Sequence, residues 1–185
     1  MEQLDFSKIS MTGRFCYVFM CIEKYLTEKW PDRDWTIIAE HMWQWTKQYW
    51  DESWDIYSVI VPEYIMQHDS YEVTRDVDFD GELDQDVYNR LIDLYSDITD
   101  GQGTCDFDIL MKIPCDMGNI CDGAAFSSAE RLVQEEMDIV FELLDRADVA
   151  LPAIEKVNDF DVSIGNGWGG FMDTTYLSII LGGRK

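Results

Sequence analysis

Apolar residues recur every three to four positions through much of this chain, and that spacing limits what it can fold into. In residues 13–29 the apolar side chains fall on one face, while Glu23, Lys24 and Glu28 fall on the other. A period of about 3.6 residues is typical of an amphipathic helix. Pro31 ends this helix, because proline disfavours the helical conformation in the residue before it. Residues 13–29 are therefore predicted to form a helix.

Further segments show the same period, and capping residues or prolines mark their ends. We expect helices over residues 35–49, 54–66, 85–98 and 127–147. Asp34 is the expected N-cap of the first of these, and Pro62 interrupts the second. Ser127 and Glu130 form a capping box at the start of the last. Pro152 opens a short helix in this interpretation.

The remaining segments lack a clear period. Residues 67–84 are polar and acidic and predict a loop, and residues 104–126 predict an irregular segment with a short extended piece near 109–113. The glycines of residues 165–170 predict a structural turn around Trp168, and residues 176–181 fit either a helix or a strand. The sequence therefore predicts one domain over residues 1–185. Its fold is all-α or mostly α, a compact helical bundle with an irregular, glycine-containing C-terminal region.

Tryptophan is concentrated in one part of the chain. Six of the seven tryptophans lie between Trp30 and Trp54. Apolar residues make up 46% of the chain and aromatic residues 14%, which excludes a disordered chain. We expect a core built on large aromatic side chains, and the alternative is that one or two of the tryptophans are exposed as binding anchors.

Negative charge is concentrated in the middle third. Residues 51–110 hold 17 Asp or Glu but only Arg75 and Arg90, a balance of −15 within a total of −23. Like charges repel in a compact fold, so such an excess calls for a basic partner or a bound cation. The scarcity of Lys and Arg argues against direct binding to nucleic acid or to an anionic membrane.

Five cysteines in an irregular pattern do not form a secreted disulfide framework, and no run of apolar residues is long enough to span a membrane. We expect a soluble protein of the cytoplasm. The spacing of the cysteines and of His41 and His68 does not fit a zinc site, and no nucleophile-and-base pattern is readable. The sequence thus predicts neither an enzyme nor a cofactor.

One stretch, residues 76–87, matches the start of an EF-hand calcium loop. Acidic residues stand at its odd positions, Gly81 at position six and an apolar residue at position eight. The candidate calcium ligands are Asp76, Asp78, Asp80, Glu82 and Asp84. Position twelve should supply a bidentate Glu, but it is Val87. Calcium binding is therefore the alternative function, set against a solvated acidic loop in which Asp84 caps the next helix.

Four segments together resemble a bacterial immunity protein: the aromatic helix Gly13–Tyr25, the Trp-rich helix after it, Ile98–Gly101 and Asn166–Gly169. The resemblance is one of general character over most of the chain. It implies a small cytoplasmic protein, encoded beside a polymorphic or contact-dependent toxin, that has no catalytic activity. Such a protein binds one cognate toxin domain and masks its active site or an adjacent exosite.

The charge pattern fits that role, because a toxin domain that cuts nucleic acid must itself be basic. An acidic protein can bind to the basic surface with which such a toxin holds phosphate. The opposite electrostatic fields of the two proteins then speed their association. The predicted partner-binding residues form an acidic rim and two aromatic anchors: Asp76, Asp78, Asp80, Glu82, Asp84, Asp86, Trp50 and Trp54.

Overall fold

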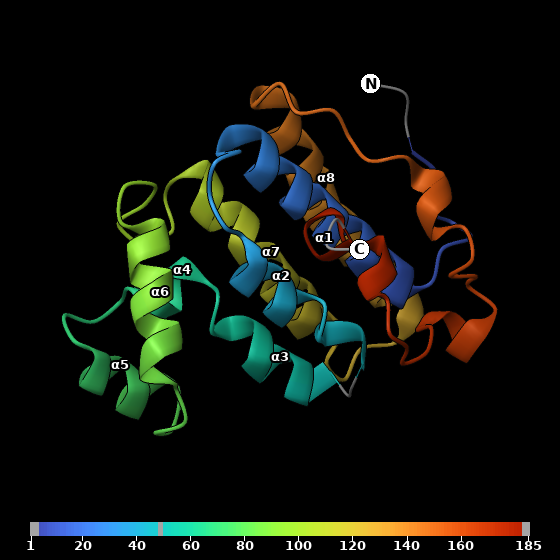
Figure 1. Ribbon diagram of the computed structural model, residues 1–185. Coiled ribbons are helices and arrows are strands. Elements are labelled where there is room, and N and C mark those ends of the chain that lie inside the picture. The colour runs from blue at the N-terminus through green and yellow to red at the C-terminus, as the bar shows by residue number, and fades with distance from the viewer. Residues whose placement is uncertain (1–3, 48–49, 183–185) are drawn as a thin grey trace.

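The computed structural model describes residues 4–47 and 50–182, and within them the chain is helical (Figure 1). The α-helices are α1 Met11–Lys29, α2 Thr36–Met42, α3 Trp50–Ser58, α4 Pro62–Ile65, α5 Tyr71–Asp78, α6 Gln85–Tyr95, α7 Asp106–Cys121, α8 Phe126–Arg146 and α9 Ile179–Gly182. Four short 3-10 turns are η1 Trp45–Lys47, η2 Ile154–Val157, η3 Ile164–Gly167 and η4 Thr175–Leu177. The described residues form no sheet, and the prediction of a mostly-α fold is confirmed.

Helix α1 runs through the middle of the molecule. Every residue from Met11 to Ile22 is buried, and the helix contacts α7, α8, α9 and η2. Helices α7 and α8 pack along each other, and α4, α5 and α6 form one end of the molecule (Figure 1). The N-terminal segment pairs with the C-terminal one, where Ser10 N donates to the Phe160 carbonyl at 2.7 Å. Segments from both ends of the chain therefore build one core around α1.

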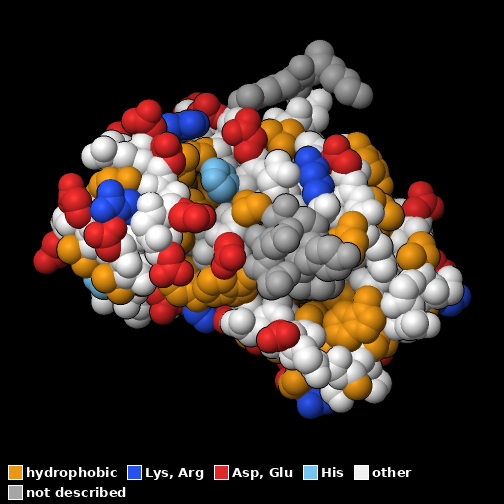
Figure 2. All heavy atoms as spheres, turned by 90° about the horizontal axis from the view of Figure 1, so that it is seen from below, with side chains coloured by type: hydrophobic (Ala, Val, Ile, Leu, Met, Phe, Trp, Pro, Cys, Tyr) orange, Lys and Arg blue, Asp and Glu red, His pale blue; other side chains and the backbone are white. Residues whose placement is uncertain are grey.

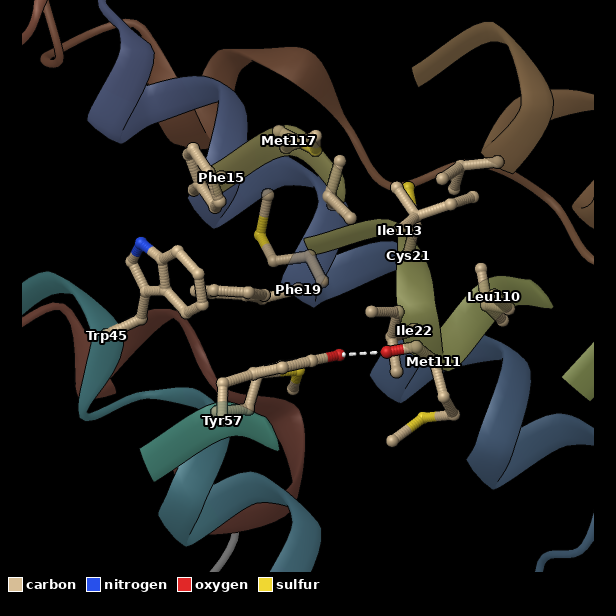
Figure 3. Close-up of a cluster of buried hydrophobic side chains, with 14 of the residues drawn as sticks. Phe15, Phe19, Cys21, Ile22, Trp45, Tyr57, Leu110, Met111, Ile113 and Met117 are labelled. Atoms are coloured by element: carbon tan, nitrogen blue, oxygen red, sulfur yellow. Dashed lines mark hydrogen bonds between the residues drawn. The ribbon is translucent and has the colours of Figure 1, made fainter. Parts of the chain in front are cut away.

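Aromatic rings fill the space between α1, η1 and α3 (Figure 3). Phe15 stacks on Trp45 with ring centroids 5.0 Å apart, and Phe19 stacks on Tyr57 at 6.1 Å. The Tyr57 hydroxyl donates to the Met111 carbonyl on α7 at 2.9 Å, so the ring is held at both ends. Trp35, Trp43 and Trp45 are likewise buried. The predicted core of large aromatic side chains is confirmed for these residues.

The spacing predicts that Glu23 lies on the polar face of α1, but in the structure this residue is completely buried. Its carboxylate accepts from the Trp43 indole N–H at 2.8 Å, from the Ser178 hydroxyl at 2.5 Å and from the Ile179 amide at 2.7 Å. Burial raises the pKa of Glu23, and these hydrogen bonds oppose that rise. The periodicity argument fails here because it treats every carboxylate as solvated, whereas this one joins α1 to α2 and to the start of α9.

Two segments predicted to be non-helical contain helices. Residues 106–121, predicted irregular because of Pro114 and Gly118, form α7 with Pro114 inside it. Asp106 and Asp108 lie in its first turn, where negative charge favours a helix. Burial of its apolar residues outweighs the amide that proline lacks. Residues 71–78 of the predicted loop form α5, which Ser70 caps by accepting from the Val73 amide.

Capping residues were predicted with mixed success. Helix α8 begins at Phe126 with no side-chain cap, so the capping box of Ser127 and Glu130 is wrong. Glu130 instead pairs with the buried Arg14 at 2.7 Å, an interaction across 116 residues that local sequence does not reveal. Asp34 is not the N-cap of α2 as predicted, because that position is Trp35, although the Asp34 carboxylate accepts from the Thr36 amide at 3.1 Å. Asp84 caps α6 as predicted.

The glycine-rich segment forms the predicted turn around Trp168. Gly165, Gly167 and Gly169 have positive φ, and the Trp168 carbonyl accepts from the Thr12 amide at 3.1 Å. The Trp168 ring lies edge-on to Phe126, at 5.7 Å between centroids. The turn thus holds the C-terminal segment against the start of α1 and of α8.

Cysteines serve as buried apolar residues, as expected for Cys16 and Cys21. All five are free, and four of them are buried. Burial raises the pKa of Cys16 to about 12, so this thiol stays protonated near neutral pH.

We predict that stability depends on pH through Glu23. Folding raises the pKa of this carboxyl, so the folded chain binds more protons than the unfolded chain does. The contribution of Glu23 to the free energy of unfolding therefore falls as the pH rises above the ordinary pKa of a glutamate. Urea denaturation from pH 4 to 7.5 should therefore show Glu23→Gln losing less stability with rising pH than the wild type. Glu28→Gln, on the exposed face of the same helix, is the control and should follow the wild type. Parallel curves for Glu23→Gln and wild type would contradict the assignment.

A second prediction concerns the close approach of α1 to the C-terminal segment. A Cβ added at Gly13 would lie 2.5 Å from Ile9 Cγ2 and 2.6 Å from Phe160 Cβ. Gly13→Ala should lower the free energy of unfolding by about 1–3 kcal/mol, despite the better helix propensity of alanine. Gly182→Ala, with no atom within 4 Å of its added Cβ, is the matched control and should leave stability nearly unchanged. Equal stabilities of the two variants would refute the close packing.

Candidate partner-binding site

A cavity of about 480 Å³ lies between α2, α3 and the connection from α5 to α6. Its apolar lining includes Trp54, Val59, Phe79 and Leu83. Four carboxylates, those of Asp55, Asp78, Asp80 and Glu82, also line it, and His41 reaches it from α2. We call this space the Trp54 cavity.

The acidic wall is shaped by a tight turn after α5. Asp80 and Gly81 both have positive φ, 48° and 87°, which reverses the chain at the end of the helix. The Gly81 amide donates to the Arg75 carbonyl at 2.9 Å, and the Tyr71 hydroxyl donates to the Leu83 carbonyl at 2.8 Å. Leu83 is buried while Asp80 and Glu82 stay exposed. The turn thereby holds two carboxylates at the rim over an apolar residue.

Trp54 forms part of the opposite wall. It is half-buried on α3, and its ring lies 5.8 Å from that of Tyr64. Its indole N–H is shielded from solvent and has no hydrogen-bond acceptor among the described residues. A partly exposed tryptophan between carboxylates is the arrangement expected of an interface anchor.

The structure brings together four of the predicted partner-binding residues, Trp54, Asp78, Asp80 and Glu82, around this one cavity. Asp76 and Asp86 do not line it. Asp76 is exposed and pairs with Arg75 at 2.7 Å, and Asp86 is exposed in the first turn of α6.

Asp84, also predicted for the rim, accepts from the Asp86 and Val87 amides at 2.8 and 3.0 Å, so its first role is structural. Trp50 starts α3, but its side chain lies outside the described residues.

The loop required for calcium is not formed in the described structure. Asp76 and Asp78, the first two candidate ligands, lie in the last turns of α5 rather than in a loop. Asp78 Oδ2 is 3.1 Å from His68 Nε2, and Asp76 pairs with Arg75. In the part of the chain that the structure describes, no three His, Cys, Asp or Glu side chains are grouped so that they could hold a metal ion.

Sequence reasoning missed the contributions of His41 and Phe79 to the cavity. His41 Nδ1 lies 2.8 Å from the Ile37 carbonyl, a contact within its own helix. Phe79 is an apolar residue inside an acidic stretch. Its position among acidic residues is the one sequence signal that could have indicated a contact with the rest of the fold. No sequence signal placed His41 beside a segment about forty residues away.

One carboxylate of this wall, that of Asp78, has a basic neighbour, since its Oδ2 lies 3.1 Å from His68 Nε2. None of the described residues that line the Trp54 cavity is Lys or Arg. Elsewhere acidic residues have such partners, as in Arg33–Asp97 at 2.5 Å and Arg146–Asp106 at 2.8 Å. In Figure 2, Asp and Glu side chains gather over the end of the molecule formed by α5 and α6, with hydrophobic side chains between them. This site can attract and hold a positively charged group.

A larger cavity, of about 740 Å³, lies between the N-terminal segment and α8. It contains the buried Arg14, which already donates to Glu130 and to the carbonyls of Phe6 and Ile9. Because this guanidinium is already hydrogen-bonded within the fold, the Trp54 cavity is the better candidate site.

Comparison of the chain with protein-family models, with curated proteins and with solved structures finds no match. None of the helices in the described ranges combines the length and the apolar character that crossing a membrane requires. The site is therefore interpreted from its own geometry.

The structural role of Asp84 can be separated from its charge. Asp84→Ala removes the cap of α6 and should lower the free energy of unfolding by about 1 kcal/mol. Asp84→Asn keeps a capping oxygen and should lower the free energy of unfolding by only a few tenths of about 1 kcal/mol. Thermal or urea denaturation of both variants checks this, and an Asp84→Asn variant as unstable as Asp84→Ala would show that charge, not capping, matters at this position.

Proposed function

We propose that the protein is a non-catalytic, acidic inhibitory protein that binds a basic bacterial toxin domain, a nuclease, and masks its active site or an adjacent exosite. The observation that carries this proposal is the set of carboxylates around the Trp54 cavity, lined by no Lys or Arg among the described residues. The general resemblance of the chain to immunity proteins supports the same role.

The mechanism follows from the chemistry of the target. A nuclease binds phosphate with Lys and Arg, and the acidic end of this protein offers carboxylates to the same groups. Opposite fields raise association rates by roughly ten- to a thousandfold, which matters for an inhibitor that must act before its target does. The proposal places this encounter in the cytoplasm of the cell that makes both proteins.

Affinity requires more than charge. In this proposal Trp54 is the aromatic anchor, Asp78, Asp80 and Glu82 surround it, and Asp76 and Asp86 extend the acidic rim. Buried aromatic anchors inside a polar rim carry most of the binding free energy in typical interfaces. Exposed rim charges mainly set the association rate.

The proposal predicts that a toxin domain is encoded beside this gene, and that domain is the probe in the test. Stopped-flow or surface-based kinetics should give an association rate that falls at least about tenfold when salt is raised from low to physiological levels. Asp80→Asn/Glu82→Gln should lower that rate at low salt and flatten its salt dependence. These changes remove two charges without disturbing the cap at Asp84.

A matched variant, Glu142→Gln/Asp145→Asn, removes two exposed charges from α8 and controls for net charge. It should bind nearly as fast as the wild type. Absence of binding to the toxin domain at low salt, with toxin activity intact, would refute the inhibitory role. Equal slowing by both double variants would mean that the α5–α6 end is not the surface that meets the toxin.

A further inference from the structure

We propose that the Trp54 cavity receives an arginine side chain of the partner, so that the guanidinium lies between the indole and the carboxylates. This inference rests on the proposed function, because it names the group on the basic partner that the site recognises. It goes further in assigning one side-chain type to one cavity.

Size and lining fit a whole side chain rather than a surface charge contact. The cavity, about 480 Å³, falls in the range of roughly 300–1,000 Å³ that is typical of sites for small ligands. Phe79, Leu83 and Val59 give it apolar walls. A long aliphatic stem can pack on such walls while its charged end reaches the carboxylates.

The charged end has several acceptors, and none of the described lining residues is a Lys or Arg that would compete for them. Asp80 and Glu82 are exposed at the rim, and Asp78 is half-buried below them. Asp55 adds a fourth carboxylate from α3. Five N–H donors of one guanidinium can be satisfied by such a set.

Arginine fits better than lysine for two reasons. A guanidinium is planar and stacks on aromatic faces, and it is less strongly hydrated than an ammonium group. Trp54 supplies the aromatic ring with the strongest cation–π interaction of the side chains. A compact ammonium would keep its water and gain less from the indole. The site should therefore discriminate between the two basic residues.

The direct test follows the Trp54 indole N–H resonance by two-dimensional NMR of the ¹⁵N-labelled full chain, with assignment by Trp54→Phe. The probes are three capped pentapeptides, Gly-Gly-X-Gly-Gly, in which X is arginine, lysine or the neutral isostere citrulline. The arginine peptide should shift this resonance saturably, the lysine peptide should bind about fivefold more weakly, and the citrulline peptide should have no effect.

Variants locate the interaction. Asp80→Asn/Glu82→Gln should weaken binding of the arginine peptide at least about fivefold, and Glu142→Gln/Asp145→Asn should leave it unchanged. No response of Trp54 to the arginine peptide, or an equal response to citrulline, would overturn the proposal.

Binding of the toxin domain distinguishes failure of the inference from failure of the function. If the toxin domain binds Trp54→Phe and Asp80→Asn/Glu82→Gln as tightly as wild type, the inhibitory function stands and the arginine cavity is refuted. If the arginine peptide shifts Trp54 but the toxin domain does not bind, the cavity chemistry stands and the inhibitory function is refuted.

Discussion

The buried carboxylate of Glu23 is the interaction on which the rest of the fold depends. Moving an ion out of water is unfavourable by several kcal/mol unless hydrogen bonds replace its hydration. Here donors from three places supply them: Trp43 just after α2, the Ser178 hydroxyl and the first amide of α9. A four-residue helix such as α9 has free amides at its start and little stability of its own. The carboxylate therefore fixes the C-terminal segment on α1 and α2, and the segment in turn closes the core around α1.

How much of this fold could be predicted depended on whether the determining interaction was local. Helix α1, the aromatic core and the Asp84 cap follow from spacing and from contacts within a few residues, and they are confirmed. Glu23 and Glu130 were misplaced because their partners are 155 and 116 residues away in the chain. Helix α7 was missed because Pro114 is a strong local signal against a helix, and only burial against α8 and α1 outweighs it.

The candidate site shows the same division. The acidic stretch and Trp54 could be singled out from composition, but not that a turn at Asp80 and Gly81 would set them around one cavity. Sequence also could not separate the carboxylates already engaged by the fold, such as Asp84 and Asp76, from those free to meet a partner. That separation needs three-dimensional geometry. The geometry narrows the candidate binding residues from the whole acidic stretch to Trp54 and a few carboxylates. Substitution of each is expected to have a distinct effect on binding.

The pairing of the N-terminal segment with residues 160–169 also has a consequence for biosynthesis. Helix α1 leaves the ribosome before α8, η2 and α9, all of which contact it. The residues from Met11 to Ile22, all buried in the folded structure, must therefore wait until those later segments are made, and such late, non-local contacts make folding slow and aggregation-prone. A nascent or prematurely ended chain would expose α1 to chaperones and proteases. The core around α1 can therefore close only after residues 160–179 have been made.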